Sequence, residues 1–303
     1  MTLAQTLGIV LRGMAMGAAD VVPGVSGGTI AFVTGIYTRL ITSLTSFDLK
    51  ALSLIVRLRF TDAWKQVDGN FLLALFVGIL SSIYLFAHII SYVLEHHPLL
   101  LWAFFFGLIF ASTIWMLFEL GRPKVLELLP LAAGIAFVLL ISTSAAASLS
   151  PSLPVVFLAG FVVISAMLLP GVSGSFLLLL VGLYAPTIDA VKNLDFIYMA
   201  TFASGAAIGF LVFSRLIKWL LTHFYRSTLL FLIGLLGGSL YVVWPWKQVE
   251  AEVPTNLLPA AYASEVGDPM ILWVLLSMAA GAAIVLSFEL MFGKSNKETG
   301  VSE

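Results

Sequence analysis

The sequence contains the same helix-breaking phrase twice, each time within strongly apolar sequence. Residues 23–37 read PGVSGGTIAFVTGIY and residues 170–184 read PGVSGSFLLLLVGLY, with seven of fifteen positions identical. A Pro-Gly-Val-Ser-Gly run interrupts a regular helix, because proline lacks a backbone N–H and glycine is costly inside a helix. The two phrases therefore predict two interrupted helices. A matched pair of interrupted helices in an apolar chain points to a binding site between them.

The composition predicts a polytopic, all-α membrane protein. The 303 residues are 60% hydrophobic and 10% charged, with a mean hydropathy of +1.07, whereas a soluble domain carries about 25% charged residues. Several stretches reach the roughly 20 apolar residues that span a bilayer. The net charge of −1 gives no indication of a nucleic-acid partner, and the absence of cysteine excludes thiol catalysis. No His/Asp/Glu cluster has metal-ligand spacing, so we expect neither a metal nor another cofactor.

The apolar stretches divide the chain into two predicted repeats. The first, 1–147, contains a re-entrant hairpin at 7–41, a basic amphipathic insert at 42–70, and spans at 71–94, 99–119 and 129–147. After a linker at 148–154, the second repeat, 155–292, contains a hairpin at 155–184 and spans at 196–221, 228–245 and 270–291. A polar tail follows at 293–303. Within the insert, residues 49–60 predict an interfacial helix with a basic side, and the WPW at 244–246 predicts an aromatic belt.

The repeat extends beyond the two phrases. An offset of 147 residues aligns the breaks, and an offset of 127 aligns later positions: Gly78 with Gly205, His96 with His223, and Gly107 with Gly234. The change of offset falls at the basic insert, 42–70. Glycines at the same spacing in both copies indicate duplicated units, since apolar matches alone carry little information in so apolar a chain.

The charge distribution predicts that the two repeats are inverted. If each hairpin returns to its starting side, each repeat crosses the membrane an odd number of times, and the positive-inside rule tests the result. Eleven basic residues then lie in cytoplasmic segments: Arg39, Lys50, Arg57, Arg59, Lys65, Arg122, Lys124, Lys218, Arg226, Lys294 and Lys297. Only Lys192 and Lys247 lie outside. We therefore expect both termini in the cytoplasm and two hairpins that enter from opposite leaflets and meet near the midplane.

The broken tips are candidates for an anion site. Backbone N–H groups are freed near a helix start, which carries partial positive charge and binds phosphate, and glycine lets a ligand approach the backbone. The alternative is a kink or a close packing contact, which small residues also provide; two copies in inverted halves favour a site. The candidate phosphate-binding residues at the tips are Gly24, Ser26, Gly27, Gly28, Thr29, Gly171, Ser173, Gly174 and Ser175.

Charged residues within apolar sequence are further candidates. Arg12 and Arg215 are predicted counter-charges for a phosphate, because an intramembrane arginine indicates a functional site; the alternatives are snorkelling of either side chain or an ion pair of Arg215 with Asp20. Asp20 precedes the first break and is expected to cap the hairpin, pair with an arginine or carry a proton. Its counterpart in the second copy is Met167, so this role is asymmetric. His88 aligns with Arg215 and is either a packed, hydrogen-bonded histidine or a coupling residue.

Other functions fit the motifs less well. Gly-Val-Ser-Gly also matches the GxSG pattern of intramembrane serine proteases, with His88 as the base, but a nucleophile needs one activated copy rather than two. No phosphatase signature, charge ring or carbonyl filter accompanies the motifs, which disfavours a lipid pyrophosphatase and an ion channel. The same motifs would also suit a transporter of a small soluble anion, so this function remains an alternative.

Three segments together carry a family resemblance. Residues 12–37, RGMAMGAADVVPGVSGGTIAFVTGIY, 168–184, LLPGVSGSFLLLLVGLY, and 234–246, GLLGGSLYVVWPW, resemble the polyprenyl-phosphate transporter (PopT) family, formerly domain of unknown function 368. The resemblance covers essentially the whole chain. It implies a non-enzymatic transporter of the bacterial plasma membrane that returns undecaprenyl phosphate from the outer to the inner leaflet for envelope-glycan synthesis. A shielded route by alternating access, with a coupling proton or other ion, suits such a headgroup, because a bare phosphate is very costly in hydrocarbon.

Overall fold

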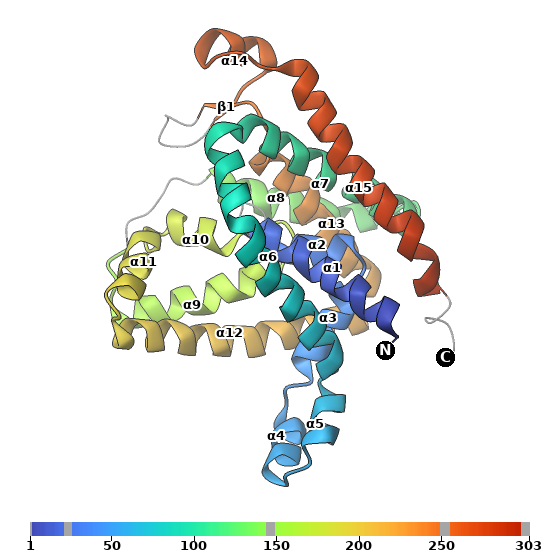
Figure 1. The fold of residues 1–303 in the computed structure, drawn as a ribbon, viewed down its shortest axis with the longest axis vertical. Helices are drawn as coiled ribbons and strands as arrows, with labels where there is room; N and C mark the ends of the chain where they lie inside the picture. The colour runs from blue at the N-terminus through green and yellow to red at the C-terminus, as the bar shows by residue number, and fades with distance from the viewer. Residues whose placement is uncertain (1, 21–25, 144–148, 249–254, 298–303) are drawn as a thin grey trace. The chain divides into compact units, whose positions relative to one another are not determined.

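The computed structural model describes residues 2–20, 26–143, 149–248 and 255–297, which form helices apart from one small antiparallel strand pair (Figure 1). The first half contains α1 (Leu3–Asp20), α2 (Gly27–Val33), α3 (Tyr37–Thr45), α4 (Leu49–Val56), α5 (Phe60–Gln66), α6 (Gly69–His96), α7 (Pro98–Leu120), a 3-10 turn (Val125–Glu127) and α8 (Leu128–Thr143). The second contains α9 (Leu153–Met167), α10 (Gly174–Leu180), α11 (Tyr184–Lys192), α12 (Phe196–His223), α13 (Tyr225–Val242), β1 (Lys247–Gln248), β2 (Thr255–Asn256), α14 (Pro259–Glu265) and α15 (Ile271–Lys297).

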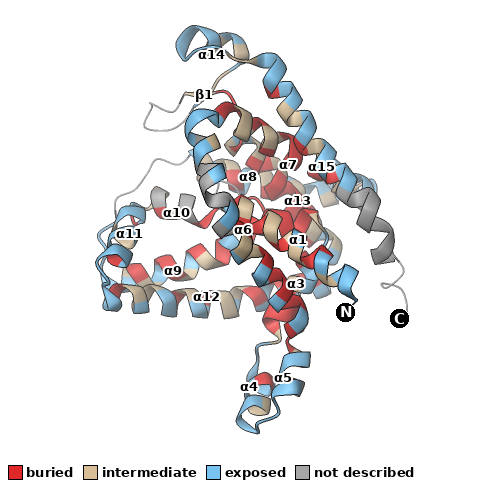
Figure 2. Ribbon diagram, viewed as in Figure 1, coloured by how far each residue is buried: buried red, intermediate tan, exposed pale blue. Residues whose placement is uncertain are grey.

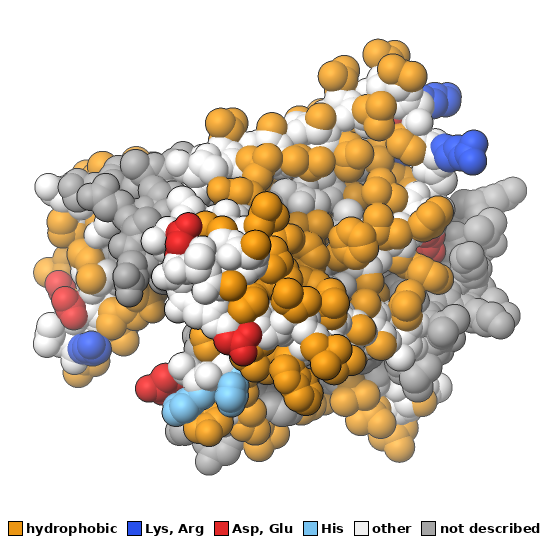
Figure 3. Space-filling view, turned by 90° about the horizontal axis from the view of Figure 1, so that it is seen from above, with side chains coloured by type: hydrophobic (Ala, Val, Ile, Leu, Met, Phe, Trp, Pro, Cys, Tyr) orange, Lys and Arg blue, Asp and Glu red, His pale blue; other side chains and the backbone are white. Residues whose placement is uncertain are grey.

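The helices confirm an all-α membrane protein. Four segments of the described chain are long and apolar enough to cross a bilayer: Pro98–Leu120, Val125–Thr143, Phe196–His223 and Tyr225–Val242. Shorter apolar helices cover Gly69–Ser82, Leu153–Met167 and Ile271–Ser287. Figure 3 shows a face on which hydrophobic side chains predominate and charged ones are few. Such a surface suits hydrocarbon rather than water.

From Ser26 and from Ser173 onward, the two copies of the repeated phrase fold in the same way. Each break is followed by a seven-residue helix (α2 and α10), a tight turn, and a nine-residue helix that begins at a tyrosine (α3 and α11). Gly35 and Gly182 form the two turns, each with φ of 72°, a conformation that glycine adopts without steric cost. The same turn hydrogen bond follows, from Ile36 N to Ala31 O and from Leu183 N to Leu178 O. Identical residues therefore build identical local structure.

The chain forms two compact units, each drawn from both halves of the sequence. The first comprises Met1–Ile90 and Ser144–Leu229, and the second Ser91–Thr143 and Leu230–Glu303. In the first unit α1 crosses α6 with almost no space between the backbones. A Cβ atom added at Gly13 would meet the carbonyl oxygen of Leu75, and one added at Gly78 would meet that of Val10, both well inside van der Waals contact. Only glycine permits this approach at either position.

The crossing of α9 and α12 in the same unit repeats these contacts. A Cβ atom at Gly160 would meet Phe202 O, and one at Gly205 would meet Phe157 O. The α1 and α9 members of these contacts are related by the 147-residue offset, and the α6 and α12 members by the 127-residue offset. The two crossings are therefore built from corresponding residues.

The second unit contains another pair of matched crossings. On α7 and α15, Gly107 lies against Met278 O and Gly281 against Phe104 O; on α8 and α13, Gly134 lies against Phe231 O and Gly234 against Leu131 O. The same two offsets relate these contacts, and each crossing takes one helix from each half of the chain. The division into repeats 1–147 and 155–292 stays a proposal, which the matched crossings support.

Two local expectations are wrong. The predicted helix over 49–60 ends at Val56, because Leu58 takes a left-handed φ of 56°. Bonds from Leu58 N to Ile55 O and from Arg59 N to Leu54 O close the helix end as a Schellman-type turn. The expected aromatic belt fails at Trp246, which is only 4% exposed and packs with Leu99 and Val274. Its indole N–H donates to Pro269 O at 2.9 Å.

Lys247 follows this tryptophan and lies close to the second unit's core. Its ammonium group sits 4.1 Å from the centre of the Trp102 ring and donates to the Val242 carbonyl. Burial disfavours the charged form and lowers the pKa of Lys247 to about 8. The unfolded chain therefore binds an additional proton between pH 8 and 10.5, and folding stability from this group rises with pH across that window.

We expect the Lys247 amine to titrate about pH 8 in the folded protein, rather than at its ordinary value of 10.5. NMR of the ¹³C-methylated lysine amines in detergent measures this titration, and Lys247→Arg assigns the resonance by its loss. A Lys247 resonance that still titrates above pH 10 would contradict the burial seen here.

We expect Gly78→Ala and Gly205→Ala to destabilise the protein by about 1–3 kcal/mol each, because the added methyl group forces two backbones apart. Thermal unfolding in detergent reports this as a lowered Tm. Gly237→Ala is the matched control, since a Cβ atom there lies 3.7 Å from its nearest neighbour. Equal Tm values for the three variants would show that the crossings are looser than described.

Candidate functional site: the contact between the two broken helices

Within the first unit, the second break region contacts the helices that follow the first break. The backbone N–H of Gly171, in the second break, donates to the Thr29 hydroxyl at 2.8 Å. The Tyr37 hydroxyl donates to the carbonyl oxygen of Leu168 at 2.7 Å. A Cβ atom at Gly28 would lie 2.8 Å from Met167 O, so the backbones also approach closely there. Residues more than 130 positions apart thus form one buried contact, as the repeated phrase predicts.

Groups of the chain itself already bind the N-terminal end of α2. Ser26 caps this helix, and its hydroxyl accepts from Gly28 N at 3.1 Å. The Asp20 carboxylate, at the end of α1, accepts from Gly27 N at 2.6 Å. The N–H groups expected to be free for phosphate are therefore occupied here, by a hydroxyl and by an anion. Gly24 lies outside the described residues.

The second tip differs from the first in the residue that lies against its helix start. Gly171 takes φ of 81°, Ser173 is buried at 7% exposure, and Gly174 begins α10. A Cβ atom at Gly27 would lie 2.6 Å from Asp20 Oδ2, and one at Gly174 would lie 2.7 Å from Met167 Cγ. Asp20 and Met167 thus occupy the same place in the two copies, and only the first tip carries a carboxylate. The side chain of Ser175 lies outside the described residues.

Arg215 forms a contact that is separate from the one at the tips. Its guanidinium donates to Leu211 O at 2.7 Å and to Phe47 O, just after α3, at 3.4 Å. The alternative ion pair between Arg215 and Asp20 does not form in the described parts of the chain. Arg12 is half-buried on α1, beside the Gly13 crossing, and the side chain of His88 lies outside the described residues.

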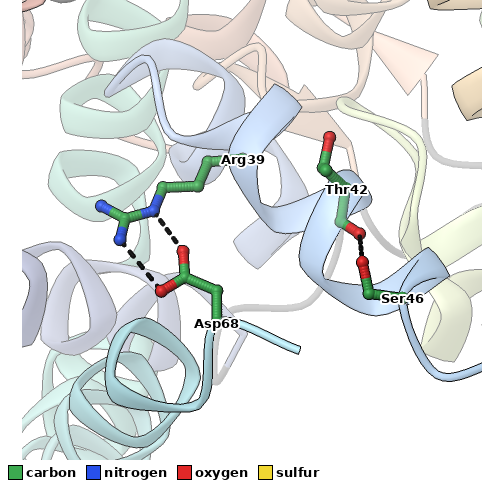
Figure 4. A network of polar contacts seen from close by, with 4 residues as sticks. All are labelled: Arg39, Thr42, Ser46 and Asp68. Atoms are coloured by element: carbon green, nitrogen blue, oxygen red, sulfur yellow. Dashed lines mark hydrogen bonds and ion pairs between the residues drawn. The ribbon is translucent and has the colours of Figure 1, made fainter. Parts of the chain in front are cut away.

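Tyr37 and Arg39 are two residues at this site that the sequence analysis did not select. Tyr37 is 3% exposed and connects α3 to the second break; its presence among the identical positions of both phrases was the available signal. Arg39 binds Asp68 through Nε at 2.7 Å and Nη2 at 3.2 Å (Figure 4). Its guanidinium also lies 4.4 Å from the Phe71 ring centre. These contacts hold α3 against the start of α6 and so position the tip.

The arrangement can bind polar groups without a metal. Buried hydroxyls (Ser26, Thr29 and Ser173), backbone N–H groups and one carboxylate gather where small residues keep two helix ends close. No three His, Asp or Glu residues of the described segments are grouped to hold a metal ion. Hydrogen-bond donors and acceptors that already satisfy one another can exchange partners with an entering ligand.

These features define an all-α membrane protein in which two interrupted helices meet at a buried polar contact. A family model described as VCA0040-like, undecaprenyl phosphate translocase-like, matches residues 16–257. The chain belongs to this family.

Curated relatives match over most of their length. The polyprenyl-phosphate transporter of Vibrio cholerae serotype O1 is 41% identical over 291 residues, covering 92% of this chain and 94% of the relative. The polyprenyl-phosphate transporter of Staphylococcus aureus is 33% identical over 268 residues, covering 82% and 88%. No solved structure matches the chain significantly.

We expect Thr29→Val to destabilise the protein by about 1–3 kcal/mol, because it leaves the buried N–H of Gly171 without an acceptor. Thermal unfolding in detergent measures the loss. Thr34→Val is the matched control: the Thr34 hydroxyl donates only to Ile30 O within its own helix, and that oxygen keeps its bond from Thr34 N. Equal Tm values for the parent protein and both variants would show that the contact between Thr29 and Gly171 is not formed in solution.

Proposed function

We propose that this protein returns undecaprenyl phosphate from the outer to the inner leaflet of the bacterial plasma membrane, where the carrier re-enters envelope-glycan synthesis. The observation that carries the proposal is the contact of the second Pro-Gly-Val-Ser-Gly break and the residue before it with α2 and α3, the two helices that follow the first break. Membership of the translocase-like family and the names of both curated relatives supply the substrate class. Transport of an intact lipid needs no covalent step.

We propose that the phosphate binds at the two tips by exchanging hydrogen-bond partners. It takes the N–H groups now held by Asp20, Ser26 and Thr29, and the hydroxyl of Ser173 adds a donor. Arg12 and Arg215 supply counter-charge, for which the Arg215 guanidinium leaves the Phe47 carbonyl. Phosphate oxygens favour these donors because both charged and backbone N–H groups bind them strongly.

Asp20 is the proposed coupling residue. Its carboxylate holds Gly27 N and carries the same charge sign as the substrate, so the two anions repel and compete for one donor. Protonation of Asp20 weakens its hydrogen bond and removes the repulsion, which favours phosphate entry. Met167 in the second copy has no proton to exchange, so the coupling belongs to one tip.

We propose an inverted arrangement of the two repeats for the membrane topology. The hairpins enter from opposite leaflets, both termini are cytoplasmic, and one repeat rocks against the other to expose the site alternately. The charge distribution and the matched glycine crossings support this arrangement. The phosphate stays shielded at the tips while the polyprenyl tail remains in lipid.

A proteoliposome assay of undecaprenyl phosphate movement, run under pH gradients of both signs, tests the proposal. We expect Ser173→Ala and Arg215→Ala each to lower the rate roughly tenfold or more, because each removes a hydrogen bond to a charged group. Asp20→Asn is expected to abolish the effect of the gradient, whereas Asp62→Asn, on the surface of α5, is expected to keep it. Parent-like rates in both tip variants would refute the site assignment.

The same assay separates the competing functions. Full competition by inorganic phosphate or glycerol phosphate would indicate a transporter of soluble anions, since only a lipid carrier depends on the tail. Labelling of Ser26 or Ser173 by a fluorophosphonate would indicate a serine hydrolase.

A further inference from the structure

Two short helices of the first unit, α4 and α5, expose large apolar side chains. Both helices are drawn mostly as exposed in Figure 2, where they extend away from α3. Only Ala51 and Ala63 are buried within them. The exposed apolar residues of this hairpin are Leu49, Leu52, Ile55, Val56, Leu58, Phe60 and Trp64. Helices of eight and seven residues are about 10–12 Å long, too short to cross a hydrocarbon core of about 30 Å. Their exposed apolar side chains are therefore not those of a membrane-spanning helix surrounded by lipid.

Basic residues interrupt this apolar surface. Asp48–Gln66 contains Lys50, Arg57, Arg59 and Lys65 against two acidic residues, an excess of two positive charges. Both carboxylates are engaged within the hairpin: Asp48 caps α4 through Ala51 N, and Asp62 pairs with Arg59 at 2.7 Å. Arg57 and Lys65 form no ion pair within the described residues. Their charge is therefore available to an anionic partner.

The hairpin is held in a defined orientation. Gln66 Nε2 donates to Asp48 Oδ1 at 2.9 Å and closes its base. The Trp64 ring lies directly over Gly69, and its Nε1 donates to Asn70 Oδ1 at 2.9 Å, which joins α5 to the first turn of α6. The turn at Leu58 keeps its own Schellman-type bonds. The exposed side chains are thus presented on a rigid support.

The second copy of the fold lacks this hairpin. Residues 46–68 connect α3 to α6, whereas only residues 193–195 connect the corresponding α11 and α12. The 28-residue helix that follows is the same length in both copies. The hairpin is therefore an addition to the repeated framework, present between α3 and α6 and absent between α11 and α12.

We propose that the α4–α5 hairpin docks on anionic phospholipid headgroups at the membrane surface. Leu49, Leu52 and Val56 recur at helical spacing and fit the boundary between headgroups and acyl chains, together with Leu58 and Phe60 at the turn. Arg57 and Lys65 contact the lipid phosphates, and anionic lipid concentrates around them. An apolar edge beside uncompensated basic residues complements a lipid surface better than a protein, and the docking does not depend on whether the chain transports lipid.

The chain has no cysteine, so Leu58→Cys provides a single labelling site in the full-length protein. A fluorophore there is compared in nanodiscs of phosphatidylcholine alone and with phosphatidylglycerol, using brominated lipid and aqueous iodide as quenchers. We expect brominated lipid to quench roughly twofold more strongly in the anionic discs, and high salt to remove this difference. A label at Ser264→Cys, exposed on α14, is the control that iodide quenches equally in both discs.

Charge variants on the Leu58→Cys background complete the test. Arg57→Gln with Lys65→Gln is expected to abolish the dependence on phosphatidylglycerol, and Lys192→Gln, at the end of α11, is expected to preserve it. Equal iodide quenching at Leu58 in both discs would overturn the proposal and indicate a surface that faces water or a protein partner. Lipid quenching without any dependence on phosphatidylglycerol would overturn the recognition of anionic headgroups.

Discussion

Backbone contact at glycine is the constraint on which the rest of the structure depends. Helices in lipid gain little from hydrophobic association, so their packing relies on close approach and van der Waals contact. Gly13 and Gly78 hold α1 against α6, and Gly160 and Gly205 hold α9 against α12. These crossings fix the two helices that lead into the breaks. The helices that support both tips are thus positioned by residues that have no side chain.

The tip contact combines strong donors with an internal anion. Thr29, Ser26 and Asp20 accept hydrogen bonds from backbone N–H groups at the tips. Each buried N–H group left without such a partner would destabilise the fold by about 1–3 kcal/mol. In the proposed mechanism, an incoming phosphate replaces these acceptors one for one. Asp20 gives the first tip a titratable carboxylate, whereas Met167 gives the second tip none.

The basic hairpin shows how an addition differs from the framework that carries it. Its helices are anchored by Trp64, which bonds to Asn70 in the first turn of α6, and by Gln66, which bonds to Asp48 at the start of α4. The two described crossings of the first unit lie elsewhere, on α1, α6, α9 and α12. The hairpin can therefore change its surface without disturbing the contacts that position the tips.

The sequence by itself determined the broken helices, the glycine turns after them and the duplicated spacing, because proline and glycine act on their own backbone. It also indicated the family through three motifs. Only the tertiary structure decided which groups meet. Asp20 binds Gly27, Arg215 binds the Phe47 carbonyl, and Trp246 is buried rather than facing lipid. Tyr37 joins a carbonyl 131 residues away, a partner that hydropathy and spacing do not specify. Such contacts depend on how helices cross, and the crossing is set by side chains and glycines from distant segments together.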